Sequence, residues 1–247
     1  MKLQLNVKIS TILYIMMLLP LIGHAQVKNV ISTQRVFPKM DKIMEFESGL
    51  AAHAQKYHTG DVSWRVFQVQ SGPDAGGYHI TEGPTSWEGE DARGNLGPDH
   101  MQDWYKNVSM YLTDRQSAGY SVYIDSLSTI ALGDFTENIN ITHVYPKIGK
   151  SDNVVNIIRN LKKTWMANGS TVAVYAASSS GPTQYTLVTR YKQGLKERTP
   201  GFRPPFKETY EKVNGAGSWT KYLNDGELYV EKTWSELLML RPDLSSK

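Results

Sequence analysis

The 247-residue sequence contains no cysteine. This absence excludes disulfide bonds, thiolate nucleophiles and thiolate metal ligands, so stability must come from the packed core. Phe is also scarce, at six residues, whereas the chain has six Trp and 14 Tyr. Because Trp and Tyr carry a polar group on a large apolar ring, they suit the wall of a partly hydrated cavity. The composition therefore favours a fold with a cavity, with ordinary core packing as the alternative.

Several catalytic motifs and any strong charge are absent as well. The sequence has no G-x-S-x-G, H-E-x-x-H, G-x-x-x-x-G-K-[ST] or G-x-G-x-x-G, so hydrolase, zinc-protease, P-loop and Rossmann classes lose support. The formal net charge is +3, and it would fall to +1 (3 − 2) if Lys2 and Lys8 were removed with a leader. A nearly neutral surface gives no electrostatic reason to expect a nucleic acid or an anionic membrane as partner.

The sequence also lacks an apolar run of the about 20 residues that a transmembrane helix needs. The apolar run from Thr11 to Ile22 follows two lysines and precedes the small residues Gly23 and Ala25. Such a pattern is typical of a secretory signal peptide. We expect residues 1–25 to be cleaved, the protein to be periplasmic or extracellular, and no membrane anchor to remain; an uncleaved anchor is the alternative.

A weak internal repeat is present. Three short matches occur in the same order, at offsets of 108 (144 − 36) and 109 (169 − 60 and 180 − 71). The matched pairs are VFPK at 36–39 with VYPK at 144–147, Gly60 with Gly169, and Ser-Gly-Pro at 71–73 with Ser-Gly-Pro at 180–182. Ordered matches at one spacing indicate a duplication, and we expect two units, residues 26–134 and 135–247.

Each unit shows the same order of periodic patterns. Apolar residues at helical spacing predict helices over 41–57 and around 154–165, and a second helix at 101–112 and at 205–213. Alternating stretches predict the strands, including a closing strand GELYVEKTW at 226–234. The Ser-Gly-Pro tripeptides are explained as hairpin turns. The order strand, helix, strand, strand, helix, strand is that of a ferredoxin-like unit.

Two such units in tandem resemble the dimeric α/β-barrel superfamily over about residues 27–240. The resemblance implies an α+β fold, with two tandem ferredoxin-like βαββαβ units whose antiparallel sheets pack face to face as a pseudo-dimeric α/β barrel within one chain. The duplication itself predicts a monomer with an internal pseudo-dimer, or a weak homo-oligomer if the paired sheets associate further. The segments SGPDAGGYHITEGPTSW and HMQDWYKNV are similar to an uncharacterised group of exported bacterial proteins in this superfamily.

The superfamily includes small oxygenases, haem-degrading enzymes, haem peroxidases, chlorite-decomposing enzymes and binding modules. Fold therefore does not choose the function, and the choice must come from individual residues.

Two histidines on strands are the candidate catalytic residues. His79 alternates with Tyr78 and Ile80, so it faces the space between the sheets if these two neighbours pack under the helices. His143 lies on another strand, and its repeat equivalent is Arg35 (143 − 108). An imidazole in such a cavity can act as a base, a metal ligand or a haem ligand. A hydrogen-bonded interior histidine is the alternative.

Aromatic and arginine side chains complete the expected cavity. We expect Trp64, Tyr123 and Tyr175 to contact a ligand, and Arg35 and Arg190 to hold an anionic group of that ligand.

The other histidines are not expected to carry chemistry. His100 and Asp103 are three residues apart, a spacing that allows shared metal ligation, but a helical wheel turns Asp103 away from the apolar face. Asp103 is explained as a charge in the first turn of a helix, and His58 as a cation at the C-terminus of another. His53 is explained as packing at a helix boundary. We therefore expect no metal site.

These observations predict an exported small-molecule binding protein or cofactor-independent enzyme that uses the cavity between the two sheets. A non-catalytic interaction module of the cell envelope is the alternative, and a haem-binding protein is a weaker one. Inward-facing His79 and His143 would favour a ligand or haem site. A cavity filled by Trp64, Tyr175 and aliphatic side chains would favour the interaction module.

Overall fold

The computed structural model describes residues 27–179 and 181–247. The predicted signal peptide and Ser180 lie outside these residues. The first half forms β1 (Val30–Pro38), α2 (Ile43–Tyr57), β2 (Trp64–Ser71), β3 (Tyr78–Thr85), α3 (Trp87–Arg93), α4 (Pro98–Asn107) and β4 (Leu112–Tyr123). The second half forms β5 (Asn138–Pro146), α5 (Ser151–Asn168), β6 (Val172–Ala177), β7 (Tyr185–Arg190), α6 (Phe206–Asn214), α7 (Ser218–Tyr229) and β8 (Val230–Leu240). Short 3-10 turns lie between some of these elements.

The strands form one closed antiparallel barrel in the order β1-β3-β2-β8-β5-β7-β6-β4. The strands of the first half are neighbours, and so are those of the second. The pairs β2–β8 and β4–β6 join the halves. Whereas the sequence suggests two sheets that only face each other, their edges are hydrogen-bonded into a single sheet. Closure leaves none of the described strands at a sheet edge, where backbone hydrogen-bonding groups would be exposed.

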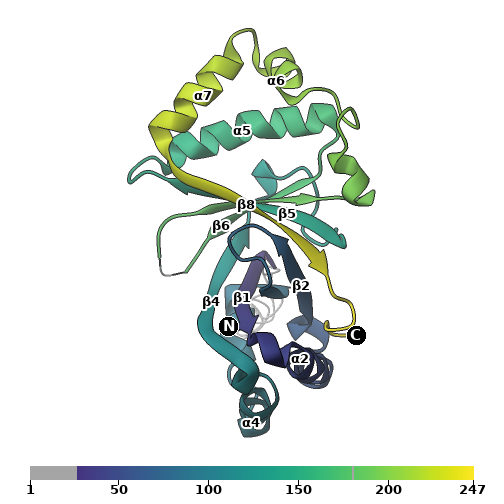
Figure 1. Cartoon of the computed structure of the whole chain (residues 1–247). Coiled ribbons are helices and arrows are strands. Elements are labelled where there is room, and N and C mark those ends of the chain that lie inside the picture. Colours follow the sequence, from purple (N-terminus) through teal and green to yellow (C-terminus); the bar gives the residue numbers. More distant parts are fainter. Residues whose placement is uncertain (1–26, 180) are drawn as a thin grey trace, which may run out of the picture.

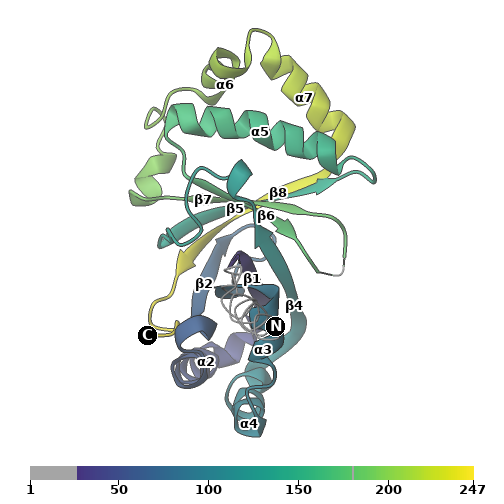
Figure 2. The ribbon, with the colours of Figure 1, turned by 180° about the vertical axis from the view of Figure 1, so that it is seen from behind.

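Helices cover the barrel on two opposite sides (Figures 1 and 2). On one side lies α5, with α6 and α7 packed on it, and on the other lie α2 and α4. Among the helices in the described part of the chain, none is both long and apolar enough to cross a membrane. The fold is therefore α+β, with a closed antiparallel sheet between two helical layers.

Three apolar clusters follow from the alternation of strand side chains. One cluster lies inside the barrel and combines both halves, including Phe67 from β2 and Leu238 from β8. A second packs the outer strand residues Val66 and Ile80 against α2. The third packs the outer face of the second half against α5. Because successive strand residues point to opposite faces, the outward placement of Ile80 turns its neighbour His79 inward.

The predicted helix over 154–165 lies within α5, which ends at Asn168 and is followed by Gly169 in the left-handed conformation, with φ of 73°. Two boundaries between a helix and a strand were predicted wrongly. The helix expected over 101–112 ends at Asn107, and Leu112 already begins β4. The strand expected from Gly226 begins only at Val230, because α7 continues through Tyr229. In both places apolar residues continue across the boundary between helix and strand, so their spacing does not mark it.

The Ser-Gly-Pro turns place glycine where the backbone requires it. Gly72 has a φ of 104° and Gly181 has a φ of 130°, a region that favours glycine. A Cβ on Gly72 would lie 2.8 Å from the carbonyl oxygen of Ser235, so the turn also passes close to β8. Hairpin geometry thus accounts for this glycine, and the turn is followed by Asp74, which contacts the barrel cavity.

Candidate functional site

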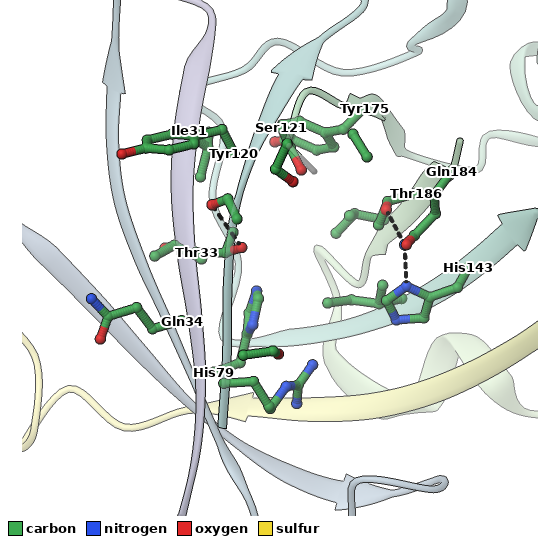
Figure 3. A pocket seen from close by; sticks show the side chains of 18 of the residues that line it. Ile31, Thr33, Gln34, His79, Tyr120, Ser121, His143, Tyr175, Gln184 and Thr186 are labelled. Carbon is green, nitrogen blue, oxygen red and sulfur yellow. Dashed lines mark hydrogen bonds between the residues drawn. The ribbon is translucent and has the colours of Figure 1, made fainter. Parts of the chain in front are cut away.

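A cavity of about 350 Å³ lies inside the barrel (Figure 3). Its apolar wall includes Ile31, Phe67, Ile139, Ile141 and Val188. Polar side chains from both halves of the chain project into it, among them His79 from β3 and His143 from β5. The cavity is thus an apolar chamber with a few convergent polar groups, the usual composition of a small-molecule site.

Five of the seven candidate residues line this cavity, namely Arg35, His79, His143, Tyr175 and Arg190. Tyr123 packs in the neighbouring barrel core, where its hydroxyl donates to the carbonyl of Ile130 at 2.7 Å. Trp64 was misplaced by the prediction. It shares the outer face of β2 with Val66 and packs under α2, because residues two apart on a strand point the same way.

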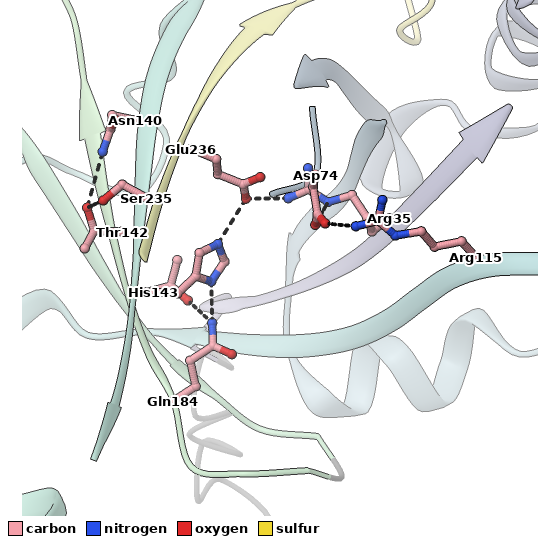
Figure 4. A network of polar contacts seen from close by, with 10 residues as sticks. Arg35, Asp74, Arg115, Asn140, Thr142, His143, Gln184, Ser235 and Glu236 are labelled. Atoms are coloured by element: carbon pink, nitrogen blue, oxygen red, sulfur yellow. Dashed lines mark hydrogen bonds and ion pairs between the residues drawn. The ribbon is translucent and has the colours of Figure 1, made fainter. Parts of the chain in front are cut away.

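A buried carboxylate connects polar groups of the two halves (Figure 4). Glu236 is fully buried, and its Oε1 accepts hydrogen bonds from Arg35 Nη2 at 2.5 Å and from His143 Nε2 at 3.0 Å. The Arg35 Nε also lies 3.6 Å from Asp74, which pairs with Arg115. The network thus contains two carboxylates and two guanidinium groups, whose formal charges cancel.

His143 is held in place on every side. Its Nε2 donates to Glu236, and its Nδ1 accepts from the Gln184 side-chain amide at 2.6 Å. Trp234 stacks on its ring, with ring centres 3.9 Å apart. Because both ring nitrogens have partners, His143 is suited to position Glu236 and Gln184 and has no free nitrogen for a ligand.

His79 differs from His143 in this respect. Its Nδ1 is buried and has no hydrogen-bond partner among the described residues. Burial lowers the pKa of His79 well below 6.5, and the positive charge of Arg35 and the nearby His143 add to this effect. His79 is therefore a neutral imidazole facing the cavity.

Arg35 stands directly opposite His79 in the pairing of β1 with β3. Its Nη1 is also buried and has no partner among the described residues. Two residues that line the cavity, at opposed positions of β1 and β3, thus each carry a buried nitrogen without a partner among the described residues.

Arg190 uses its hydrogen bonds within the protein. Its Nη1 donates to the carbonyls of Ala131, Leu132 and Asp134, and its Nη2 donates to the Tyr175 hydroxyl at 2.9 Å. The side chain therefore fastens the connection between β4 and β5 to the barrel.

The sequence analysis missed a second group of histidines, outside the barrel. His53 Nδ1 lies 2.7 Å from Asp103 Oδ2, and His58 Nδ1 lies 3.0 Å from Glu82 Oε2. Both imidazoles are fully buried, and burial lowers the pKa of each although the carboxylates act in the opposite direction. Three predictions were therefore wrong. His58 is not a cation at a helix end, and His53 is not at the boundary of the core. Asp103 does not point away, since it contacts His53.

The cause lies in how α4 packs. Its polar edge, and not only its apolar stripe, faces α2, so Asp103 meets His53 and His100 meets His58. A helical wheel of either helix alone carries no information about this contact. A signal that could have pointed to this group is the presence of three histidines on or next to these two helices.

The comparisons with known proteins bear on the fold. Searches of protein-family models and of curated protein sequences gave no match. A solved anthrone oxidase-like protein is 11% identical, with a TM-score of 0.54, covering 87% of this chain and 92% of its own. A proposed monooxygenase from Fusobacterium nucleatum is 13% identical, with a TM-score of 0.53 and coverage of 85% and 91%. A mutant chlorite dismutase from Candidatus Nitrospira defluvii is 6% identical, with a TM-score of 0.53 and coverage of 87% and 92%.

These similarities extend over nearly the whole described chain. They show that it has the fold of the dimeric α+β barrel proteins. At such low identities they show the fold alone.

Proposed function

We propose that the barrel cavity binds a compact aromatic molecule carrying a hydroxyl or a ring carbonyl, and that His79 removes a proton from it. The observation that carries this proposal is the pair of unpartnered polar atoms, Arg35 Nη1 and His79 Nδ1, on directly opposed positions of β1 and β3. A buried polar group without a partner costs about 1–3 kcal/mol. A ligand oxygen at this place would relieve that cost.

The remaining lining defines the rest of the ligand. A volume of about 350 Å³ lies near the lower end of ordinary ligand pockets, so the molecule is small. The wall of aliphatic and aromatic side chains suits a flat apolar ring system. Because Arg35 is already paired with Glu236, a neutral or weakly acidic ligand suits the site better than a strong anion.

The proposed step is a proton transfer. A neutral imidazole nitrogen of His79 takes a proton from the ligand hydroxyl, or from the carbon next to a ring carbonyl, and becomes imidazolium. The electron pair left on the ligand becomes a phenolate or enolate, whose oxygen accepts a hydrogen bond from Arg35 Nη1. The lowered pKa keeps His79 unprotonated at neutral pH and so able to accept a proton, and the negative oxygen formed on the ligand would compensate the imidazolium charge that burial disfavours.

The names of two structural neighbours suggest a probe molecule. One is called anthrone oxidase-like and another a proposed monooxygenase. Anthrone is a compact aromatic ketone with acidic hydrogens next to the ring system, so it is a suitable probe for this cavity.

The binding part is tested with 1-naphthol and 1-methylnaphthalene, which differ by a hydroxyl in place of a methyl group. Titration calorimetry should show 1-naphthol binding at least about tenfold more tightly, as expected when a buried donor gains a partner. His79→Phe should remove this difference, whereas Ser117→Ala, at an exposed residue of the lining, should keep it. Equal affinities for both probes in the wild-type protein would refute the proposal.

The proton transfer is tested separately, with anthrone in D₂O under argon. Nuclear magnetic resonance should show the wild-type protein accelerating deuterium exchange at the anthrone methylene, and His79→Phe should abolish this acceleration. The rate should fall as pH falls through the lowered pKa of His79, because protonation removes the base. Binding without acceleration would leave a binding protein and contradict the catalytic step.

Haem is the other possible occupant, because the imidazole of His79 is a potential axial ligand. The lining does not fit it well. A ligating histidine almost always donates its second ring N–H to a carboxylate, carbonyl or water, whereas the buried Nδ1 of His79 has no partner in the described structure. The nearby carboxylate of Glu236 is shared between Arg35 and His143. A cavity of about 350 Å³ is also small for a planar tetrapyrrole.

We also propose that the barrel is an internal duplication of a ferredoxin-like unit. The lysines that end the matched segments VFPK and VYPK make similar contacts in the two halves, which supports this proposal. The Lys39 amide donates to the carbonyl of Tyr111 and the Lys147 amide to that of Tyr229, each at 2.8 Å. The Lys39 side chain donates to the carbonyl one residue before its tyrosine, and the Lys147 side chain to the carbonyl two residues before. A non-catalytic envelope module would share this architecture, and failure of both probes to bind would favour it.

Export after cleavage near Ala25 belongs to the same proposal and rests on the sequence pattern alone. The mass of the processed protein tests it, since the mature chain should begin at Gln26. A mature protein that retains residues 1–25 would refute it.

A further inference from the structure

Three imidazoles converge between α2 and α4, on the outer side of β3. The ring centre of His53 lies 4.8 Å from that of His100, and the ring centre of His58 lies 5.3 Å from each of the other two. Imidazoles bound to one tetrahedral ion through bonds of about 2.0–2.1 Å place their ring centres about 5 Å apart. The three rings therefore already have nearly the mutual spacing that a tetrahedral metal imposes.

The donor nitrogens are also close together. One ligand nitrogen from each histidine lies within 4.8 Å of the other two. His58 Nε2 and His100 Nε2 are 3.3 Å apart, close to the about 3.3 Å between two nitrogens on such an ion. The ligand nitrogen of His53 lies within 4.8 Å of the other two, so it would move closer by up to about 1.5 Å (4.8 − 3.3) to complete the set.

Two carboxylates orient these imidazoles from behind. Asp103 accepts from His53 Nδ1 and Glu82 accepts from His58 Nδ1, so both histidines keep a lone pair on Nε2. Glu82 is itself held by Arg93 and by the indole N–H of Trp64, which also stacks on His58. Carboxylate–histidine pairs of this kind fix the tautomer and orientation of metal-binding imidazoles.

An unsatisfied atom points to the missing group. His53 is fully buried, and its Nε2 has no hydrogen-bond partner among the described residues. A buried nitrogen lone pair without a donor is unfavourable, and a cation between the rings would satisfy it.

We propose that His53, His58 and His100 bind one zinc ion through their Nε2 atoms, with Asp103 and Glu82 as supporting carboxylates. Three neutral nitrogen ligands suit a borderline ion such as Zn²⁺ better than Ca²⁺ or Mg²⁺, which prefer oxygen. His100 is only partly buried, so the ion has a path from solvent. The site joins the end of α2 to the start of α4 and to β3, and it is separate from the barrel cavity.

The test uses the purified chain stripped with EDTA and titrated with ZnCl₂ in a calorimeter. We expect one Zn²⁺ per chain, a melting temperature that rises with Zn²⁺ concentration, and loss of binding in His100→Ala. Asp103→Asn should weaken binding by about 10- to 100-fold, because it removes only the support of His53. His79→Phe should bind Zn²⁺ like the wild type, which separates this site from the barrel proposal.

Cobalt provides a spectroscopic check of the geometry. Stoichiometric CoCl₂ should produce the intense visible bands of tetrahedral Co²⁺ in the wild type and not in His100→Ala. His100 is the least buried of the three, so this variant is expected to fold, and far-ultraviolet circular dichroism verifies it. Absence of saturable Zn²⁺ binding, or equal binding by folded His100→Ala, would overturn the proposal.

Discussion

At the scale of single residues, Arg241 fastens the C-terminal segment to α2. Its Nη1 and Nη2 donate to the two carboxylate oxygens of Glu47 on α2, at 2.5 and 3.1 Å. The Tyr78 hydroxyl donates to the same carboxylate. The hydrogen bond from Arg241 lowers the pKa of Glu47 below 4.5. A depressed carboxyl pKa contributes stability above its unfolded value, and this contribution is lost as pH falls through the folded value.

We therefore expect Glu47→Gln to lower the free energy of unfolding by about 1–2 kcal/mol at pH 7. The difference from the wild type should shrink as pH falls below about 4.5, because Glu47 becomes protonated in the wild type too. Urea unfolding at pH 7 and in the acidic range measures both quantities. Glu208→Gln, at an exposed position of α6, is the control and should show no such difference. A Glu47→Gln effect that persists unchanged in acid would contradict this account.

At the scale of elements, the contact of α2 with α4 depends on a glycine. A Cβ on Gly49 would lie 1.7 Å from the carbonyl oxygen of Asn107, at the end of α4. The absence of a side chain thus lets the two helices approach. The same approach brings the His53 and Asp103 side chains together.

Gly49→Ala should destabilise the protein by about 1–3 kcal/mol, because overpacking outweighs the better helix propensity of alanine. Gly226→Ala in α7 is the matched control, since no atom lies within 4 Å of its added Cβ. That change should be neutral or stabilise by up to about 1 kcal/mol. Urea unfolding of both variants provides the comparison, and equal effects of the two substitutions would argue against the close helix contact.

At the scale of the whole molecule, the two halves are joined by polar as well as apolar contacts. Arg35 from β1 reaches Glu236 from β8 across the barrel interior, although these strands are not neighbours in the sheet. Both side chains are almost completely buried. The loss of one partner would leave a buried charge with weaker compensation, whereas removal of both would not.

Glu236→Leu should therefore lower the free energy of unfolding by about 3–5 kcal/mol, and adding Arg35→Met should restore much of it. A double-mutant cycle on unfolding should give a coupling above about 1 kcal/mol. The exposed pair Lys221 and Asp225 on α7 is the control, with a coupling of about 0.3–0.5 kcal/mol. Additive effects of Arg35→Met and Glu236→Leu would show that the halves are not coupled through this pair.

The α+β class and the position of α5 could be predicted from the sequence, because they depend on local periodicity. His79 shows what can be predicted from local alternation alone. Alternation with Tyr78 and Ile80 predicted its direction, and the structure places these neighbours under α2. The same rule, applied to Trp64, would have turned it outward with Val66.

Other features depend on contacts between distant segments, and only the tertiary structure decided them. The closure of the sheet depends on β2 meeting β8 and β4 meeting β6. Both ring nitrogens of His143 are hydrogen-bonded to Gln184 and Glu236, which are 41 and 93 residues away, so neither nitrogen can act as a base. The histidine cluster exists because α4 turns its polar edge toward α2. A sequence fixes which side chains share a face of one element, but the distance between two elements depends on how they pack.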